Sequence, residues 1–223
     1  KAPLFEAGGI AVKGFAVTPD EGVPAVVLPY ASVFGTGLGI DHHAMVATLR
    51  AVVGARPRVK LITGQRVDAL LRDGARVTGV RTADGTEHRA RLVVGADGRQ
   101  SKVRSLMGLV PEVKLLSFTA AVTVEGDLLP HAGHGHVFLG APAPILAYPF
   151  GENRVRMCID VPNGTKDIKA FVVSAFARFV PEPLRSAMVR SLQERPLEGC
   201  ATHSVTTEVC TGEGVALVGD AGG

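Results

Sequence analysis

The sequence predicts an α/β fold that carries an inserted, mainly β-stranded region. Two apolar runs of strand type lead directly into glycine-rich turns with an aspartate, at 95–98 and at 219–220. Residues 105–214 lie between these turns and read as several short strands followed by two helical segments. Strands that feed glycine-rich turns are typical of α/β domains, whereas the intervening pattern indicates a mixed sheet of its own.

The composition is that of a folded globular protein. The chain has 223 residues, 46% hydrophobic and 20% charged, which allows one large or two small domains. The net charge of +3 favours a phosphate-bearing cofactor, and the absence of a dense Lys/Arg block argues against nucleic acid. The three cysteines, Cys158, Cys200 and Cys210, form no C-x-x-C pair, so we expect a cytoplasmic protein without disulfides or a zinc site.

The longest apolar stretch, 137–150, is interrupted by prolines and falls short of the ~20 residues of a spanning helix. No transmembrane segment is therefore expected. The N-terminus has neither an initiator Met nor an apolar signal core, and we expect both ends of the chain to be cut from a longer protein.

The first sixty residues predict a strand pair and a helix. Ile10–Val17 and Val26–Leu28 read as strands around a Pro- and Gly-containing turn. Apolar residues then recur at helical spacing over Ala44–Val53, and Asp41 is placed to cap that helix.

Two β-rich regions follow. The first predicts the strands Val59–Thr63, Val67–Leu71, Val77–Thr82 and Glu87–Val94, with Asp-Gly turns at 73–74 and 84–85. The second predicts Leu116–Val124, His136–Leu139, Ile145–Phe150 and Arg154–Val161, and then the helices Asp167–Phe179 and Leu184–Leu192.

The stretch Arg91–Arg104, RLVVGADGRQSKVR, combines a strand, a Gly-Asp-Gly turn and a Ser-x-x-Arg helix start. Glycines let a backbone approach a ligand, a carboxylate accepts hydroxyl hydrogen bonds, and Ser101 can cap the helix. A bare Asp-Gly would indicate only a surface turn. The second strand and turn, Val215–Gly223, has the sequence VALVGDAGG.

Together these two stretches resemble the second and third fingerprints of class A flavoprotein monooxygenases, the superfamily of p-hydroxybenzoate hydroxylase and squalene epoxidase. The resemblance covers nearly the whole chain. It implies a partial FAD/NAD(P)-binding Rossmann-like domain at 1–110, a β-sheet substrate domain at 111–200, and a return to the FAD-binding domain at 201–223.

The resemblance also implies the residues of a FAD site. Asp220, with Gly219 and Ala221 in the same motif, would hold a ribityl hydroxyl. Asp97 and Gly98 would lie near the pyrophosphate and the NAD(P)H approach, and Arg104 belongs to the same fingerprint. Arg50 matches a helix arginine that contacts FAD, and Val67 matches a position whose backbone meets the adenine. No catalytic side chain is implied.

The sequence departs from the family at both ends. The N-terminal G-x-G-x-x-G unit is absent, and the helix that follows the Gly-Asp motif is also absent. The cluster Gly35–Gly39 is not a substitute, because its spacing is G-x-G-x-G and Pro29 interrupts the preceding strand. We therefore expect the isolated chain to carry part of a FAD site and to be inactive.

Other candidate sites are weaker. His131, His134 and His136 have no carboxylate or Cys partner at ligand spacing, so a polar loop is preferred to a metal site. The triplet 41–43 reads as a cap and helix start, and no G-x-S-x-G elbow occurs. Arg154 and Arg156 could meet a substrate anion, but solvated strand charges are the preferred interpretation.

The resemblance implies a FAD-dependent monooxygenase, a hydroxylase or epoxidase. Such an enzyme inserts one oxygen atom from O2 into a hydrophobic or aromatic substrate with NAD(P)H, and the apolar strands of 136–161 would face the flavin. Two alternatives stay open: a FAD-dependent reductase of the geranylgeranyl-reductase type, and a flavin-free binding domain of the same fold. Substrate-dependent oxygen uptake distinguishes the monooxygenase from the reductase. A colourless full-length protein would favour the flavin-free binding domain.

Overall fold

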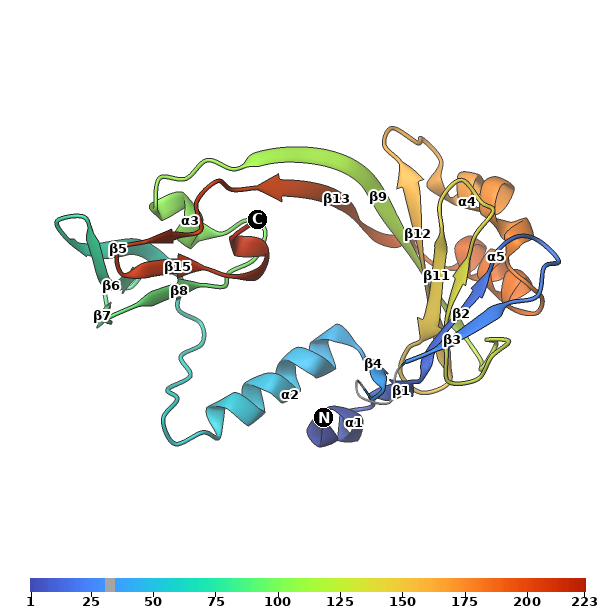
Figure 1. The fold of residues 1–223 in the computed structure, drawn as a ribbon, viewed down its shortest axis with the longest axis horizontal. Coiled ribbons are helices and arrows are strands. Elements are labelled where there is room, and N and C mark those ends of the chain that lie inside the picture. Colours follow the sequence, from blue (N-terminus) through green and yellow to red (C-terminus); the bar gives the residue numbers. More distant parts are fainter. Residues whose placement is uncertain (31–34) are drawn as a thin grey trace. The chain divides into compact units, whose positions relative to one another are not determined.

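The computed structural model describes residues 1–30 and 35–223, and the chain forms two compact units (Figure 1). The first unit contains Lys1–Val59 and Ser117–Thr202, and the second contains Lys60–Leu116 and His203–Gly223. The α/β class predicted from the sequence is confirmed. The sequence grouped 1–110 together, whereas residues 1–59 pack with the β-rich middle of the chain because strand β2 pairs with β10.

A seven-stranded mixed sheet forms the first unit, in the order β13-β9-β12-β11-β10-β2-β3. From β9 to β3 the neighbouring strands are antiparallel except for β10 and β2, which run parallel. The strands are β2 (Gly14–Thr18), β3 (Val26–Pro29), β9 (Glu112–Glu125), β10 (Gly135–Phe138), β11 (Ile145–Pro149), β12 (Arg154–Pro162) and β13 (Glu198–Thr206). The four strands predicted between 116 and 161 are confirmed, whereas β13 was not predicted.

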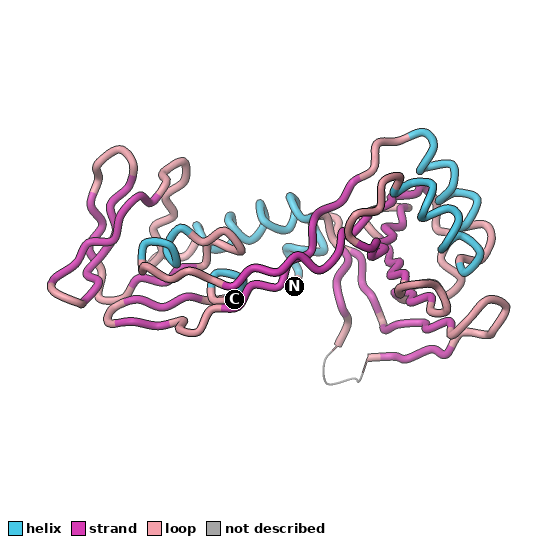
Figure 2. Tube along the Cα trace, turned by 90° about the horizontal axis from the view of Figure 1, so that it is seen from above, coloured by secondary structure: helices cyan, strands magenta, loops and turns pink. Residues whose placement is uncertain are grey.

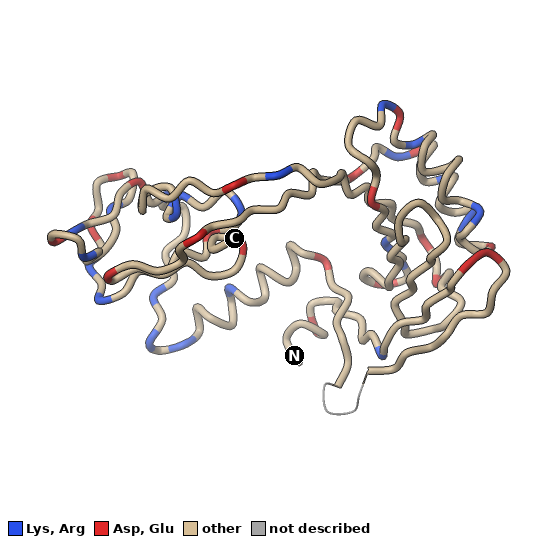
Figure 3. The backbone as a smooth tube through the Cα atoms, turned by 45° about the horizontal axis from the view of Figure 1, so that its top comes forward, with Lys and Arg blue, Asp and Glu red and all other residues tan. Residues whose placement is uncertain are grey.

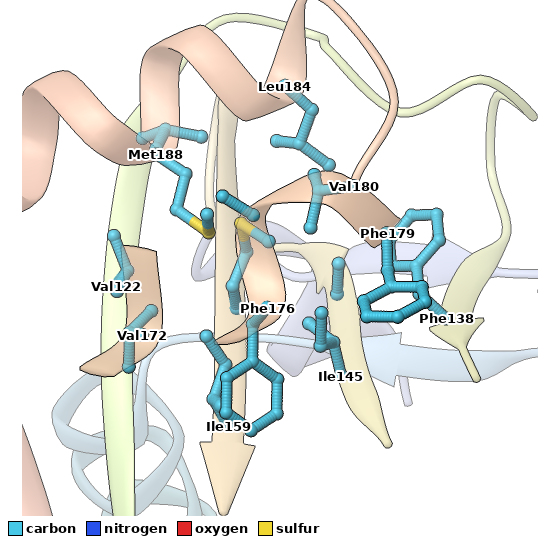
Figure 4. Close-up of a cluster of buried hydrophobic side chains, with 14 of the residues drawn as sticks. Val122, Phe138, Ile145, Ile159, Val172, Phe176, Phe179, Val180, Leu184 and Met188 are labelled. Carbon is cyan, nitrogen blue, oxygen red and sulfur yellow. The ribbon is translucent and has the colours of Figure 1, made fainter. Parts of the chain in front are cut away.

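Two helices cover one face of this sheet. They are α4 (Ile168–Phe176), extended by the 3-10 turn Ala177–Phe179, and α5 (Leu184–Glu194). Asp167 caps α4 by accepting a hydrogen bond from the Ala170 N–H at 3.0 Å. Every second residue of β12 is buried, which is the period that points one face of a strand at the helices. Figure 4 shows the resulting core, in which Phe176, Ile145 and Ile159 are fully buried.

The N-terminal segment adds two short strands and two helices to the first unit. The predicted strand Ile10–Val17 is interrupted at Lys13, because β1 (Ile10–Val12) pairs with β4 (Gly37–Gly39) while β2 pairs with β3. A Cβ atom on Gly39 would collide with the Pro149 carbonyl oxygen, so this glycine permits close backbone contact. Within the glycine cluster 35–39, residues Gly37–Gly39 thus form a strand.

Helix α2 (His42–Gly54) confirms the helix predicted in this region, and α1 (Ala2–Glu6) precedes the first strand. Asp41 caps α2: its carboxylate accepts hydrogen bonds from the backbone N–H groups of His43 and Ala44, at 2.9 and 3.1 Å. This satisfies two of the amide protons that a helix start leaves without partners.

The second unit consists mainly of strands (Figure 2). One sheet is the meander β5 (Val67–Asp73), β6 (Arg76–Thr82) and β7 (Glu87–Arg89), joined by the predicted Asp-Gly turns. The other has the order β14-β15-β8, with β14 at Thr211–Gly212, β15 at Val215–Leu217 and β8 at Val93–Gly95. Helix α3 (Lys102–Leu106) follows β8.

Two strand predictions in this unit were wrong. Residues 59–63 form no strand, and Leu61 and Ile62 are exposed there without a neighbouring strand to pair with among the described residues. The predicted run Glu87–Val94 is divided, because β7 pairs with β6 whereas the Val93 N–H donates to the Gly214 carbonyl in the other sheet.

The second unit has a small core of its own, built by Val77, Val93, Val103, Val215, Leu217 and Ala221. These residues come from both sheets, from α3 and from the final turn. Acidic and basic residues are interspersed along the chain (Figure 3), in line with the small net charge.

Candidate functional site

Strands β8 and β15 place the two aspartate-bearing turns at one sheet edge. The strands are parallel, with Val93 opposite Val215 and Gly95 opposite Leu217. Parallel strands end at the same edge, so the turn at 95–98 and the turn at 219–220 leave the sheet side by side. The Val218 N–H also donates to the Gly95 carbonyl at 2.9 Å. Ligands of α/β sheets bind outside the carboxyl ends of parallel strands, where these turns lie.

Arg104 joins the two turns. Its side chain projects from α3 and the residue is only 4% exposed. The guanidinium donates to the carbonyl oxygens of Asp220 and Ala221, at 3.3 and 3.0 Å, and to that of Arg99 at 2.5 Å. All three partners are main-chain oxygens of the turns that the sequence predicted to meet a cofactor. The predicted cofactor contact of Arg104 stays a prediction, and its guanidinium donors face the protein in this structure.

The Asp97 carboxylate caps the start of α3. One oxygen accepts the Ser101 hydroxyl at 2.5 Å, and the other accepts the backbone N–H groups of Lys102 and Val103, at 2.7 and 3.0 Å. The Ser101 hydroxyl oxygen in turn accepts the Arg104 N–H at 3.0 Å, which is the cap that the sequence predicted. Asp97 and Ser101 thus share the unpaired amide groups of the helix start.

Hydrogen bonds also set the ionisation of Asp97. Partial burial works to raise the pKa of this carboxyl group, but the Ser101 hydroxyl and the backbone N–H groups of Val103 and Lys102 outweigh it and hold the pKa below its usual range. Asp97 is therefore anionic at neutral pH. Sequence reasoning gave Asp97 a ligand role and missed this cap, although the Asp-x-x-x-Ser spacing before a helix was the available signal.

Asp220 has a different environment. It lies in the 3-10 turn Gly219–Ala221, and it is exposed. Its backbone carbonyl is bound by Arg104, whereas its carboxylate has no hydrogen-bonding partner within residues 1–30 and 35–223. A carboxylate held on a fixed turn and open to solvent fits an acceptor for a ligand hydroxyl. The residues present therefore fit the ribityl part of FAD at Asp220.

The glycines of the two turns are required for two different reasons, backbone conformation and close packing. Gly98 and Gly219 have φ of 79° and 59°, in the left-handed region that favours glycine. Gly95 has no such φ, but a Cβ there would lie 2.7 Å from Leu217 Cδ2 and 2.9 Å from Val103. The first glycine of the motif thus serves packing of β8 against β15 and α3.

The remaining predicted site residues are spread over both units. Val67 begins β5 in the second unit, opposite Thr82 of β6. Arg50 is exposed on α2, in the first unit. The second unit therefore contains seven of the predicted residues, Val67, Asp97, Gly98, Arg104, Gly219, Asp220 and Ala221, whereas Arg50 belongs to the first unit. The cofactor roles of these residues stay predictions.

The histidine cluster was partly misread. His136 lies in strand β10 and is 1% exposed, so it does not belong to a polar loop. Its Nε2 accepts the His131 N–H at 3.1 Å, which leaves Nδ1 to donate to the His134 carbonyl at 3.2 Å. Burial, reinforced by His131, lowers the pKa of His136 to about 4. Within the described residues no three His, Cys, Asp or Glu side chains are grouped as metal ligands.

The strand arginines are not simply solvated charges. Arg156 pairs with Glu198 at 2.5 Å, and its side chain is 21% exposed. Arg154 and Arg156 both lie 5.1 Å from the centre of the Phe150 ring. The preferred interpretation from the sequence was therefore wrong for Arg156, whose charge is already balanced by a carboxylate.

The helices of residues 1–30 and 35–223 are too short or too polar to cross a membrane. Two solved structures that resemble the chain are described as FAD-dependent or as a complex with FAD. PqsL of Pseudomonas aeruginosa, described as a probable FAD-dependent monooxygenase, matches 99% of this chain and 63% of its own with a TM-score of 0.78 and 22% identity. HpxO of Klebsiella pneumoniae, solved with FAD and uric acid, matches 98% of this chain and 59% of its own with a TM-score of 0.72 and 20% identity. At these identities the likeness shows the fold.

Sequence comparison identifies the family. The family model for squalene epoxidase matches residues 89–222. Squalene epoxidase 2, mitochondrial, of Arabidopsis thaliana is 31% identical over 195 residues, which cover 83% of this chain and 33% of that protein. Squalene epoxidase erg1 of Schizosaccharomyces pombe is 28% identical over 195 residues, covering 82% of this chain and 42% of that protein. The chain thus spans roughly a third to two fifths of the relatives' length, and it belongs to the squalene epoxidase family.

Proposed function

We propose that the protein is a FAD-dependent monooxygenase that inserts one oxygen atom from O2 into an apolar substrate, with NAD(P)H as the reductant. Squalene is the first substrate to test, because the relatives are named squalene epoxidases. The observation that carries the proposal is the Asp220 carboxylate. It is exposed and without a partner in the described chain, at the edge where β8 and β15 end.

Bound FAD would supply the redox chemistry, taking up electrons from NAD(P)H and making O2 reactive toward the substrate. The chain's own contribution is to bind and orient. Asp220 would accept a hydrogen bond from a ribityl hydroxyl, and Gly98 and Gly219 give the turns the backbone freedom to approach the cofactor. Arg50 and Val67 are proposed as further contacts on the family pattern.

The face of the large sheet opposite α4 and α5 supports an apolar substrate. The registers align Val17 with Val137, Val137 with Leu146, and Leu146 with Cys158, so these side chains form a row across four strands. All four are only partly buried, whereas their neighbours on the opposite face are covered by α4 and α5. Such a row would receive a hydrocarbon or aromatic group and exclude water from it.

The test uses the full-length protein. Purified protein should carry the absorbance of an oxidised flavin and should consume O2 and NAD(P)H when squalene is added, with the epoxide identified by mass spectrometry. Flavin that is reduced and reoxidised by another acceptor without substrate-dependent O2 uptake would favour the reductase alternative. A colourless protein that takes up no added FAD would favour the binding-domain alternative and overturn the proposal.

Location is part of the proposal. We propose a cytoplasmic enzyme on the basis of the free cysteines Cys158, Cys200 and Cys210. One relative carries the word mitochondrial in its name. Fractionation of cells that express a tagged full-length protein decides between the two compartments.

A further inference from the structure

A buried cation sits between the two turns of the cofactor site. Arg104 is 4% exposed, and its two terminal nitrogens bind three carbonyl oxygens, of Arg99, Asp220 and Ala221. In the described part of the chain, no carboxylate lies within ion-pair distance of it. Its backbone is also fixed, since its N–H donates to the Ser101 hydroxyl oxygen.

The chemistry of this contact favours a geometric role. A buried charge is costly, and an apolar side chain of similar size packs a core at less cost. What arginine adds is a planar fork with five donors in fixed directions, which can bind carbonyls of two separate segments at once. Lysine has a single nitrogen and cannot reproduce this fork.

The carbonyls that Arg104 binds belong to the peptide units next to the Asp220 carboxylate. Because each peptide unit is planar, fixing the carbonyl of Asp220 also fixes the direction of the following N–H. The Gly222 N–H closes the same turn on the Gly219 carbonyl at 2.8 Å, and the Cys210 thiol donates to the Gly222 carbonyl at 3.2 Å. The turn is thereby held on both sides while the carboxylate stays open to solvent.

We propose that Arg104 is a positioning residue for Asp220: it does not contact the cofactor, and it holds the turn so that the Asp220 carboxylate meets the cofactor hydroxyl. The inference rests on the proposed function for the identity of the ligand, FAD. It replaces the direct cofactor contact that the family pattern implies for this arginine.

A double-mutant cycle in the full-length protein tests the proposal, with the dissociation constant of FAD measured by quenching of flavin fluorescence. Asp220→Asn removes the ionised acceptor, and Arg104→Lys keeps the charge and removes the fork. Each should weaken binding by about tenfold or more. The double variant should bind no more weakly than Asp220→Asn alone, because Arg104 acts through Asp220. If the two single losses of FAD affinity multiply in the double variant, Arg104 contacts FAD directly and the proposal is overturned. An Arg104→Lys variant that binds FAD as tightly as the wild type would also overturn it.

A matched control and a rescue exclude a merely structural role. Arg72 is an exposed arginine of the same unit that also donates to carbonyl oxygens, and Arg72→Lys should leave FAD binding unchanged. Arg104→Ala leaves a space shaped for a guanidinium ion. Millimolar guanidinium chloride should restore much of its FAD binding, whereas urea at the same concentration should not. Loss of binding without any rescue by guanidinium would count against the positioning role.

A readout without FAD separates the two proposals. Arg104→Lys should speed amide hydrogen exchange at 219–222 and leave β6 (Arg76–Thr82) unchanged. If the wild-type protein binds no FAD, the proposed function fails, and the exchange data still decide whether Arg104 fixes the turn. Unchanged exchange at 219–222, or equal loss of protection across the whole unit, would overturn the positioning role.

Discussion

Gly95 and Leu217 are partners in the parallel pairing of β8 with β15, and a Cβ on Gly95 would lie 2.7 Å from Leu217 Cδ2. Gly95→Ala should therefore destabilise the second unit by about 1–3 kcal/mol, since the added methyl overpacks the contact. Urea unfolding followed by circular dichroism measures the change. Gly98→Ala is the matched control: nothing lies within 4 Å of its added Cβ, and the expected cost is about 1 kcal/mol from its φ of 79°. Equal losses in the two variants would contradict the packing role of Gly95.

Asp220→Ala should reduce FAD affinity of the full-length protein without reducing its stability. The lost hydrogen bond to a carboxylate is worth roughly 1.5–3 kcal/mol, or about a ten- to hundredfold rise in the dissociation constant. The melting temperature without FAD should stay constant, because the carboxylate is exposed and has no partner in the described chain. Glu213→Gln, at another exposed acid of the same unit, serves as the control. A fall in stability without a fall in affinity would remove Asp220 from the site.

Asp97→Asn should destabilise the second unit by about 1 kcal/mol at neutral pH, because the anionic cap of α3 is weakened. The folded pKa of Asp97 is depressed, so its stabilisation is present above the unfolded pKa near 4 and is lost as the pH falls through the folded pKa. The difference between wild type and variant should thus shrink below about pH 4. Unfolding curves at pH 7, 4 and 3 measure it, and a constant difference across that range would contradict the role of the charge.

His136 should make the first unit sensitive to mild acid. Its folded pKa of about 4 lies below the unfolded value of 6.5, so the unfolded chain takes up a proton first as the pH falls. Stability contributed by neutral His136 is complete above pH 6.5 and is lost between 6.5 and 4, by up to about 3 kcal/mol. Electrostatic interactions with His131 and His134, which lie beside it, also act to lower the pKa of His136.

His136→Gln should flatten the pH dependence of stability between pH 4 and 6.5, as measured by thermal unfolding. His42→Gln, at an exposed histidine of the same unit, should leave the wild-type slope in place. The prediction fails if both variants keep that slope.

Val172 and Val173 are neighbours on α4 with opposite environments, 0% and 37% exposed. Val172→Ala should cost about 2 kcal/mol because it leaves a cavity in the core of the first unit. Val173→Ala should cost less than about 0.5 kcal/mol. Chemical unfolding of both variants compares them directly, and similar costs would mean that the helix does not pack against the sheet through Val172.

Local patterns predicted most of the elements, because each follows from a short period or a cap. Three helix starts were predicted at or next to the residues that cap them, Asp41, Asp167 and Ser101. The Asp-Gly turns predicted the meander. The errors came from pairing between distant segments. The local sequence around Lys13 and Ala90 does not indicate that the chain passes from one sheet to another there. Strand β13 contains too few apolar residues to be predicted as a strand.

The candidate site was predictable in part for the same reason. The two fingerprints located Asp97 and Asp220, but which groups they bind depends on side chains that meet only in the fold. The resemblance to the family implied a cofactor contact for both aspartates. In the structure one carboxylate is used by helix α3 and the other is free to meet a ligand.

The parallel pairing of Val93–Gly95 with Val215–Leu217 also has a consequence for biosynthesis. The ribosome delivers the first strand long before the second, and the whole of Ser117–Thr202 emerges in between. The meander β5–β7 has only short loops to close, so it can form early. Strand β8 pairs with β15, which is distant in the chain and is synthesised later. Arg104 has no carbonyls of the final turn to bind until then. The edge that carries Asp97 and Asp220 therefore forms only after β15 has been synthesised, and β8 lacks this partner strand in the nascent chain until then.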